Sequence, residues 1–379
     1  MPEDRRRETS LRILFIQGVA RYGGALRSLL HTMRLLKRAG GYPILVTSRE
    51  GRLTEECRAH KIAYETVPMG MWRKVKSWPL FPVVFFRLTR LILDNRVDLI
   101  HCNTLWDAPY GILLGWITRR PVTVHLRNVH SENLVSKYHI NLARSVVGVS
   151  FECLKHLNPE IRRRSHTIYN PWEESPQITP AGDFSISLIG RLDTTKGQRE
   201  FVERVYLPIT GILNLGLDMV GGASAKEKFL EEEAKGWERT LPLLKYRGQV
   251  KEIHRFYKKA MFIVIPSLPS ALEGVPRVAI EAFSFGRCAV ATDSGGTKEA
   301  VFEKTGVLVG QVEEMKRPVV ALSMIPRLRR KLGVNAQRFV EKKMNPQGHI
   351  ESLIRIWQAS SQGEPPSQGE RYGETCRRG

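Results

Sequence analysis

The chain has 379 residues, of which 42% are hydrophobic and 26% are charged, and its formal net charge at pH 7 is +21. This length favours two domains, and the hydrophobic content excludes an intrinsically disordered chain. Arginines interrupt the longest apolar runs before about 20 residues, so we expect no membrane-spanning helix. The five cysteines are scattered, which favours neither a disulfide framework nor a zinc site and predicts a reducing, cytoplasmic compartment.

The excess of positive charge lies mainly in the first half of the chain. Residues 1–180 hold 28 basic and 15 acidic residues, whereas residues 181–379 hold 31 and 23. Such a field favours anionic partners: nucleotide diphosphates, acidic lipid headgroups or nucleic acid. Residues 1–8 are also basic, but they lead into a strand-like run without a cleavage site, so we expect no secretion signal.

Apolar, β-rich runs alternate with helix-length segments along both halves of the chain. In the first half they are Leu11–Ile16, Ile44–Thr47, Asp98–Cys102, Val122–Leu126 and Val146–Val149. In the second half they are Phe184–Ile189, Leu217–Val220, Phe262–Ile265 and Ala289–Thr292. Near-continuous apolar strands separated by helices are typical of parallel sheets covered on both faces. The sequence therefore predicts an α/β protein with two doubly wound, Rossmann-like halves.

The boundaries follow from changes in composition. Between residues 169 and 183, proline, glycine and acidic residues replace the apolar periodicity, which predicts a first domain of residues 1–172 and a second of residues 173–345. A helix is expected at 346–360. Residues 361–379 have no apolar face and are expected to be disordered.

Parallel sheets bind ligands at the carboxyl ends of their strands, so the loops that follow strands hold the candidate site. In the loop after the 184–189 strand, Gly190 permits a sharp turn, and Arg191 and Lys196 suit a diphosphate. Taken alone, an arginine and a lysine beside a turn are more often solvated surface cations.

The loop after the 262–265 strand carries two carboxylates around a helix start. Pro276 fits the first turn of a helix, which places Glu273 on the preceding loop and Glu281 more than a turn inside. The N–H groups of Arg277 and Val278 would then be available to a phosphate. The alternative is that Glu273 merely caps the helix and Glu281 is solvated.

Two glycine pairs follow other strands. Gly295-Gly296 comes after the 289–292 strand, and Gly23-Gly24 comes after the first strand. Each pair permits close approach of the backbone to a ligand, although a simple tight turn explains either pair equally well.

Together these segments resemble a known family. Gly-Arg-Leu-x₃-Lys-Gly, the Glu273-x₇-Glu281 pair and Ala-Thr-Asp-x-Gly-Gly-x-x-Glu occur in the order and spacing of retaining GT-B glycosyltransferases of family four. The resemblance is strong over residues 184–310 and weaker, but collinear, before them. It implies two Rossmann-like domains facing a central cleft, with the acceptor side in the first domain and the donor site in the second. It also implies that the helix at 346–360 packs back towards the first domain.

The resemblance also implies roles for individual residues. Glu273 would contact the transferred sugar near its anomeric carbon, Glu281 the nucleotide ribose, and the backbone at Val250 the base. The donor diphosphate would be held by Arg191, Lys196, Gly23, Gly24, Arg277 and Val278. Preorganised cations and amides of this kind favour the charge separation of sugar–phosphate cleavage. Arg277 and Arg287 stand where many relatives carry uncharged residues.

In the first domain, the resemblance implies that His125 contacts the sugar or the acceptor. The alternative is an ordinary strand-end histidine satisfied by the backbone. Asn103 and Arg127 are further candidates on the acceptor side. We expect no metal and no cofactor, because the nucleotide diphosphate sugar is a co-substrate and the sequence shows no clustered carboxylate or histidine set.

Residues 71–88, MWRKVKSWPLFPVVFFRL, mix tryptophan, phenylalanine and cations. This composition is typical of segments that lie on an anionic bilayer, so we expect a peripheral position on the inner face of the membrane, at a lipid-linked acceptor. The alternative is an ordinary core-facing helix with solvated cations.

The sequence thus predicts a glycosyltransferase that moves a sugar from a nucleotide diphosphate sugar to an acceptor hydroxyl with retention of configuration. The family suggests assembly of cell-surface polysaccharide, lipopolysaccharide or another glycolipid. One alternative is a sugar-nucleotide epimerase or a phosphorylase on the same scaffold, which would need its own base constellation or a cofactor lysine. Another is a basic protein that binds polyanions, including nucleic acid, without turnover.

Overall fold

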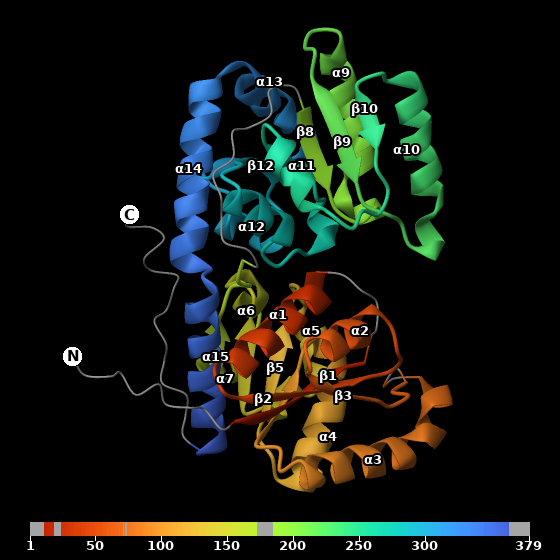
Figure 1. The fold of residues 1–379 in the computed structure, drawn as a ribbon, viewed down its shortest axis with the longest axis vertical. Helices are drawn as coiled ribbons and strands as arrows, with labels where there is room; N and C mark the ends of the chain where they lie inside the picture. Colours follow the sequence, from red (N-terminus) through yellow and green to blue (C-terminus); the bar gives the residue numbers. More distant parts are fainter. Residues whose placement is uncertain (1–10, 19–23, 71, 73, 173–184, 364–379) are drawn as a thin grey trace, which may run out of the picture. The chain divides into compact units, whose positions relative to one another are not determined.

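The computed structural model describes residues 11–18, 24–70, 72, 74–172 and 185–363 (Figure 1). The chain divides into two compact units, residues 1–170 with 346–379 and residues 171–345. The division falls beside the predicted boundary at residue 172. Gly23, Phe184 and the tail from residue 364 onwards lie outside the described residues.

The first unit is built on a seven-stranded sheet in which every neighbouring pair is parallel. The order across the sheet is β3-β2-β1-β4-β5-β6-β7. The strands are β1 (Arg12–Gln17), β2 (Tyr42–Thr47), β3 (Ala63–Thr66), β4 (Leu99–Cys102), β5 (Val122–Leu126), β6 (Ser145–Gly148) and β7 (Ser165–Thr167). The strand order reverses between β1 and β4, so the loops that follow these two strands meet at one edge.

Helices cover both faces of this sheet. They are α1 (Gly24–Arg38), α2 (Arg52–Ala59), α3 (Phe81–Asp94), α4 (Ala108–Thr118), α5 (Glu132–Ser136), α6 (Glu152–Lys155), α7 (Pro159–Arg163) and α15 (Pro346–Ser361). The last of them, α15, buries Ile350, Leu353 and Trp357 in the same core as Phe15 of β1 and Leu29 of α1. One face of the first sheet is therefore completed by the C-terminal end of the described chain.

The second unit is built on a six-stranded sheet, again parallel between all neighbours, with the order β10-β9-β8-β11-β12-β13. The strands are β8 (Ser185–Ile189), β9 (Gly216–Val220), β10 (Leu244–Tyr246), β11 (Ile263–Ile265), β12 (Ala289–Thr292) and β13 (Gly306–Val309). Here the order reverses between β8 and β11. The loops after these two strands carry Lys196 and Glu273.

The helices of the second unit are α8 (Gln198–Phe201), α9 (Leu207–Thr210), α10 (Phe229–Thr240), α11 (His254–Lys259), α12 (Arg277–Ser284), α13 (Lys316–Met324) and α14 (Pro326–Lys343). A π-helical turn, Val202–Tyr206, joins α8 to α9. The core contains Phe201, Tyr206 and Phe262, all fully buried. Among the described residues, every helix is too short or too polar to cross a membrane.

Two parallel, helix-covered sheets confirm the predicted α/β architecture of two doubly wound halves. A strand lies at each of the nine predicted runs, displaced by at most a residue or two at the ends. The pattern does not predict β3, β7, β10 and β13, and each of these is an edge strand of its sheet. Of these, β3, β7 and β10 are short and contain polar residues, so they lack the continuous apolar signature of a central strand. The sequence of β13 is apolar, and its omission has no such reason.

Candidate functional site

In the second unit, the loops that follow β8 and β11 interlock. The N–H of Leu268 donates to the carbonyl oxygen of Thr195 at 2.8 Å. Gly197 has a φ of +67°, and a Cβ atom there would lie 1.9 Å from the carbonyl oxygen of Pro266. Only glycine fits this position, because it tolerates both the left-handed backbone and the close approach. The close contact between the loops brings together side chains that are 77 residues apart in sequence.

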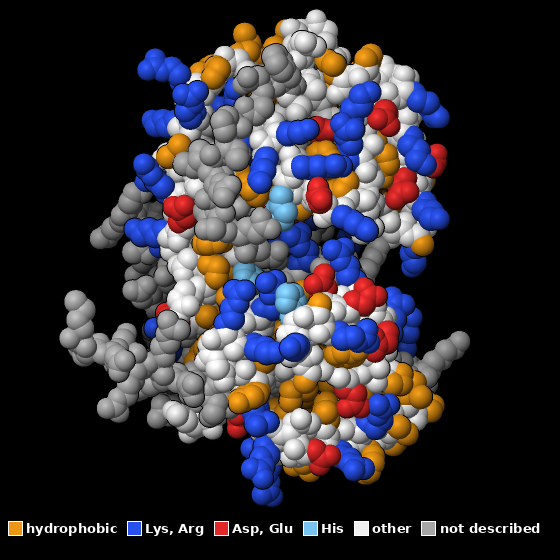
Figure 2. Space-filling model, in the orientation of Figure 1, with side chains coloured by type: hydrophobic (Ala, Val, Ile, Leu, Met, Phe, Trp, Pro, Cys, Tyr) orange, Lys and Arg blue, Asp and Glu red, His pale blue; other side chains and the backbone are white. Residues whose placement is uncertain are grey.

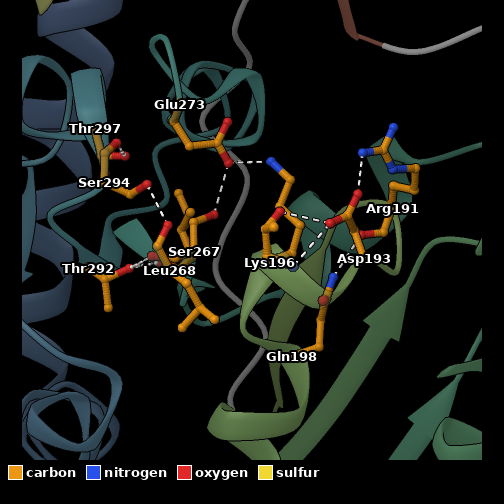
Figure 3. Close-up of polar contacts among 12 residues, drawn as sticks. Arg191, Asp193, Lys196, Gln198, Ser267, Leu268, Glu273, Thr292, Ser294 and Thr297 are labelled. Atoms are coloured by element: carbon orange, nitrogen blue, oxygen red, sulfur yellow. Dashed lines mark hydrogen bonds and ion pairs between the residues drawn. The ribbon is translucent and has the colours of Figure 1, made fainter. Parts of the chain in front are cut away.

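Lys196 and Glu273 form the centre of this site (Figure 3). The ammonium group of Lys196 is paired with the Glu273 carboxylate, and the hydroxyl of Ser267 donates to the same carboxylate oxygen at 2.9 Å. The Glu273 side chain is 13% exposed, so this pair is only partly open to solvent. The predicted diphosphate cation and the predicted catalytic carboxylate therefore lie in direct contact.

Gly295 and Gly296 hold the backbone of Glu273. The N–H of Gly296 donates to the Glu273 carbonyl oxygen at 2.9 Å. Gly295 has a φ of +60°, and a Cβ atom there would lie 2.2 Å from that oxygen. Leu272, directly before Glu273, also has a positive φ of 46°. We expected this glycine pair to allow close approach of the backbone to a ligand. In the structure, it allows close approach to the loop that carries Glu273.

Arg191 is paired with Asp193 in the loop after β8. The Asp193 carboxylate also accepts a hydrogen bond from the Thr195 N–H at 3.0 Å and one from the Thr195 hydroxyl. Burial favours the neutral acid, but the bonds from Thr195 and Arg191 outweigh it and lower the pKa of Asp193. Asp193 therefore holds the Arg191 guanidinium at the start of the loop that ends in Lys196.

Glu281 lies inside α12 and is buried, and both oxygens of its carboxylate accept hydrogen bonds from side chains. The Tyr257 hydroxyl donates to its Oε2 at 2.7 Å, and the Arg277 guanidinium donates to its Oε1 at 3.0 Å. The solvated alternative for Glu281 is therefore wrong. Its contact with a ribose stays a prediction, and so does a phosphate contact by the first-turn N–H groups of Arg277 and Val278, which intrahelical bonds do not use.

The loops that follow β8, β9 and β10 each contain a glycine, and their backbones are in contact with one another. The N–H of Gly221 donates to the Gly248 carbonyl oxygen at 2.9 Å, and a Cβ atom on Gly221 would lie 1.8 Å from the Gly190 carbonyl oxygen. Val250 is half-buried just beyond Gly248. The predicted base-contacting segment therefore belongs to the same edge of the sheet as Lys196.

In the first unit, Asp107 ties the loop after β4 to the loop after β1. Its carboxylate accepts hydrogen bonds from the N–H of Gly18 at 2.7 Å and from the hydroxyl of Thr104 at 2.7 Å. Burial raises the pKa of Asp107 to about 6. Gly24 begins α1 beyond this loop, whereas Gly23 lies outside the described residues. None of the sequence motifs includes Asp107, although it is an isolated acid in an apolar stretch that follows a strand.

Asn103 and Arg127 belong to one buried polar network. The Arg127 guanidinium donates to the side-chain oxygens of Asn103 at 2.6 Å and Asn170 at 2.7 Å. The Asn103 amide in turn donates to Gln17 at the end of β1. The structure therefore brings together two of the predicted acceptor-side residues and adds Gln17 and Asn170.

His125 lies in β5 and is buried. Its Nδ1 is 3.3 Å from Nε2 of His101, whose Nδ1 lies 3.2 Å from the indole nitrogen of Trp357. Within the described part of the chain, Nε2 of His125 is buried without a hydrogen-bond partner. The alternative of a histidine satisfied by the backbone is therefore wrong. Burial and the charge of Arg127 lower the pKa of His125 well below its usual range.

The described residues contain no group of three or more metal-ligating side chains placed to hold an ion. The prediction that the reaction needs no metal and no cofactor stays a prediction.

Two family models match the chain. Residues 22–174 match Glycosyltransferase Family 4, and residues 183–325 match Glycosyl transferases group 1. Together they cover most of both units. An uncharacterised glycosyltransferase of Methanocaldococcus jannaschii is 21% identical over 273 residues, which is 68% of this chain and 74% of that protein.

Solved structures share the fold. Anabaena HepE in complex with UDP-glucose superposes with a TM-score of 0.78 at 19% identity, covering 92% of this chain and 100% of that one. The lipopolysaccharide outer core galactosyltransferase WaaB, in its apo form, gives a TM-score of 0.67 at 12% identity, covering 93% and 99%. These similarities show a two-domain GT-B architecture.

Proposed function

The chain belongs to the family-four glycosyltransferases, and from this membership we propose that it moves a sugar from a nucleotide diphosphate sugar to an acceptor hydroxyl with retention of configuration. The UDP-glucose bound by the HepE structure supports a nucleotide-sugar donor of this class. The observation that carries the proposal is the contact between Lys196 and Glu273 at the carboxyl ends of β8 and β11.

The reaction needs this pairing of charges. Cleavage of the sugar–phosphate bond sends its electron pair to the diphosphate and leaves an oxocarbenium-like carbon. Lys196 and Arg191 would stabilise the departing diphosphate, with the first-turn N–H groups of Arg277 and Val278. Lys196 would then exchange the Glu273 carboxylate for the phosphate, which leaves Glu273 beside the anomeric carbon.

Retention would follow a front-face route. The acceptor oxygen forms the new bond on the face from which the diphosphate leaves, and the acceptor proton passes to the leaving phosphate. No step of this route requires a metal ion or a cofactor. Glu281 would bond the ribose and Val250 the base, from the same edge of the sheet.

Isothermal titration with UDP, GDP and ADP tests the donor site. We expect one nucleotide to bind selectively to the wild type, and Lys196→Ala to weaken that binding by about 1–3 kcal/mol, as for the loss of a charge-assisted bond. Lys235→Ala is the matched control, because it removes an exposed lysine from α10 of the same unit. Equal weakening by both variants would favour non-specific polyanion binding.

Product analysis separates the enzymatic alternatives. A transferase consumes the sugar nucleotide faster when an acceptor is present and releases the nucleoside diphosphate. An epimerase would convert the sugar nucleotide to an isomer without releasing it. Isomerisation without release would contradict the proposal.

The surface of α3 and α4 supports the expected position on a membrane. Phe86 on α3 is 69% exposed and Trp116 on α4 is 79% exposed. We call the surface formed by α3, α4 and the 3₁₀ turn Val75–Leu80 before α3 the α3–α4 surface. Its exposed apolar side chains are Trp78, Leu80, Val83, Phe86, Leu93, Trp116 and Ile117. Figure 2 shows hydrophobic side chains gathered over these helices, with lysines and arginines among them. Arg87 and Arg90 lie on α3 itself.

We therefore propose that the α3–α4 surface docks on an anionic bilayer. Phe81 and Phe85 of α3 are partly buried and pack on the core. Core packing therefore explains the apolar residues on one side of α3, but not those on its exposed side. An acceptor linked to lipid would fit this position, as in polysaccharide or glycolipid assembly.

Co-sedimentation with vesicles tests the docking. We expect the wild type to bind phosphatidylglycerol vesicles and not pure phosphatidylcholine, and the pair Phe86→Ser with Trp116→Ser to lose that binding. The control pair, Ile212→Ser with Phe229→Ser, removes exposed apolar side chains from the second unit. Unchanged sedimentation of the first pair, or equal losses in both, would contradict docking by the α3–α4 surface.

A further inference from the structure

Three buried aromatic rings form a hydrogen-bonded chain in the first unit. Trp357 of α15, His101 of β4 and His125 of β5 are each at most 1% exposed. The indole nitrogen of Trp357 lies 3.2 Å from His101 Nδ1, and His101 Nε2 lies 3.3 Å from His125 Nδ1. Successive rings meet edge to face, with centroids 5.6 Å and 5.4 Å apart. The chain of contacts runs from the C-terminal helix to the predicted site histidine.

The chemistry of the three groups fixes the direction of this chain. An indole N–H can only donate, so His101 Nδ1 must accept. Neutral His101 then carries its proton on Nε2 and donates it to His125 Nδ1. Neutral His125 must in turn carry its proton on Nε2.

Both imidazoles are held neutral by their surroundings. Burial, together with the positive charge of Arg127, lowers the pKa of His101 to about 3. The same two causes, with His101 itself, lower the pKa of His125. His349 adds to this effect on both rings.

This hydrogen-bonded series ends at His125, in a donor that has no partner among the described residues. Nε2 of His125 is buried, and the described residues offer it no acceptor. A buried donor left unpaired is destabilising, and such a group calls for an explanation in function or in a bound molecule. A hydroxyl oxygen of a bound saccharide would supply the missing acceptor.

We propose that Trp357 and His101 are positioning residues that hold His125 as a neutral donor, with its Nε2–H reserved for a hydroxyl oxygen of the bound saccharide. This inference rests on the proposed sugar-transfer function. It also means that His125 does not act as a base at Nε2, because that nitrogen already carries a proton.

The tautomer is measured directly by NMR of full-length protein labelled with ¹⁵N-histidine, with the His125 signals assigned from a His125→Gln variant. We expect wild-type His125 to be protonated on Nε2 and not on Nδ1. Trp357→Phe keeps an aromatic ring but removes the N–H, so His125 should become a mixture of both tautomers. Protonation on Nδ1 in the wild type, or an unchanged tautomer in Trp357→Phe, would overturn the proposal.

Kinetics separate positioning from folding. We expect Trp357→Phe to lower kcat for sugar-nucleotide turnover by about three- to tenfold, with the donor KM within about twofold. His101→Gln keeps an acceptor and a donor and should retain more activity than His101→Leu. Tyr206→Phe is the control, because it removes a buried 2.7 Å hydrogen bond to Leu215 in the other unit. An equal loss of kcat in Tyr206→Phe would overturn the positioning role.

The two proposals fail in different ways. The wild type could turn over no sugar nucleotide and still show the Nε2 tautomer and its dependence on Trp357. In that case the transferase function is contradicted, but the hydrogen-bond direction from Trp357 through His101 to His125 is confirmed. If the wild type is active and the tautomer differs, the inference fails alone.

Discussion

The backbone of Gly295 lies against the backbone of Glu273 so closely that no side chain fits between them. A Cβ atom on Gly295 would come within 2.2 Å of the Glu273 carbonyl oxygen. The loop after β12 thereby fixes the position of a carboxylate on the loop after β11.

Gly295→Ala is expected to displace Glu273. The new methyl group meets backbone rather than a flexible side chain, and φ at this position is +60°, so the loop must shift. We expect kcat to fall by about tenfold or more, while the affinity for the nucleoside diphosphate stays within a few-fold. Gly236→Ala on α10, where a Cβ has nothing within 4 Å, should be neutral or slightly stabilising. Equal activity of the two variants would show that the loop contact does not position Glu273.

Glu273→Gln should separate catalysis from nucleotide binding. The substitution releases Lys196 from its ion pair. Under the proposed mechanism it also removes the negative charge beside the anomeric carbon. We expect kcat to fall by about 100-fold or more, by analogy with the loss of other electrostatic contacts to a transition state. Titration calorimetry should show nucleoside diphosphate binding that is unchanged or tighter. Weaker binding would mean that Glu273 helps to hold the nucleotide.

Arg277 and Glu281 should be energetically coupled. The pair is nearly buried, with side chains 12% and 8% exposed, so the removal of one partner leaves the other charge uncompensated. We expect Arg277→Leu to lower the free energy of unfolding by about 3 kcal/mol, and the same change in a Glu281→Gln background to cost clearly less. Urea unfolding of the four proteins gives the coupling energy. Additive effects would show that Arg277 and Glu281 are not energetically coupled.

The first unit should lose stability in acid. Burial lowers the pKa of His101 and of His349 to about 3, whereas an unfolded histidine titrates near 6.5. The unfolded chain therefore binds more protons as the pH falls from about 6.5 towards 3, and the stabilisation present above pH 6.5 is lost over that range. Each histidine contributes at most about 1.4 kcal/mol per pH unit.

Asp107 opposes this trend in part of the range. Its pKa is raised to about 6, so its stabilising contribution is present below about pH 4 and is lost as the pH rises to 6. The histidines outnumber it, and we expect net destabilisation between pH 6.5 and 4. Urea unfolding at several pH values measures the slope, and His349→Gln should reduce it. A slope that is flat, or that is unchanged in the variant, would contradict the neutral state of these rings.

The sequence pattern anticipated the central strands and the loops that follow them, because a central parallel strand is apolar throughout and its loop stands out by contrast. Three of the four edge strands escape prediction for the opposite reason: Ser165–Thr167, for example, is short and polar, whereas the fourth, Gly306–Val309, is apolar. Hydrophobic periodicity carries little information about short strands that pair with a neighbouring strand on only one side.

The sequence predicts which residues belong to the candidate site, but not which of them are in contact. Nothing in the spacing of Lys196 and Glu273 indicates an ion pair across 77 residues, because that contact depends on strand order. His101 and Trp357 were overlooked since a histidine inside a strand and a tryptophan inside a helix are usual core residues. Only the fold shows that their nitrogens line up with His125.

The return of α15 to the first unit has a consequence for synthesis on the ribosome. The core that contains Phe15 and Leu29 also requires Ile350, Leu353 and Trp357. Residues 171–345, in contrast, hold all six strands of the second sheet in one uninterrupted segment. The second unit can therefore close as soon as its own segment has emerged. The first unit, although translated earlier, has α1 and α2 on that face of its sheet but waits for α15 to complete the cover.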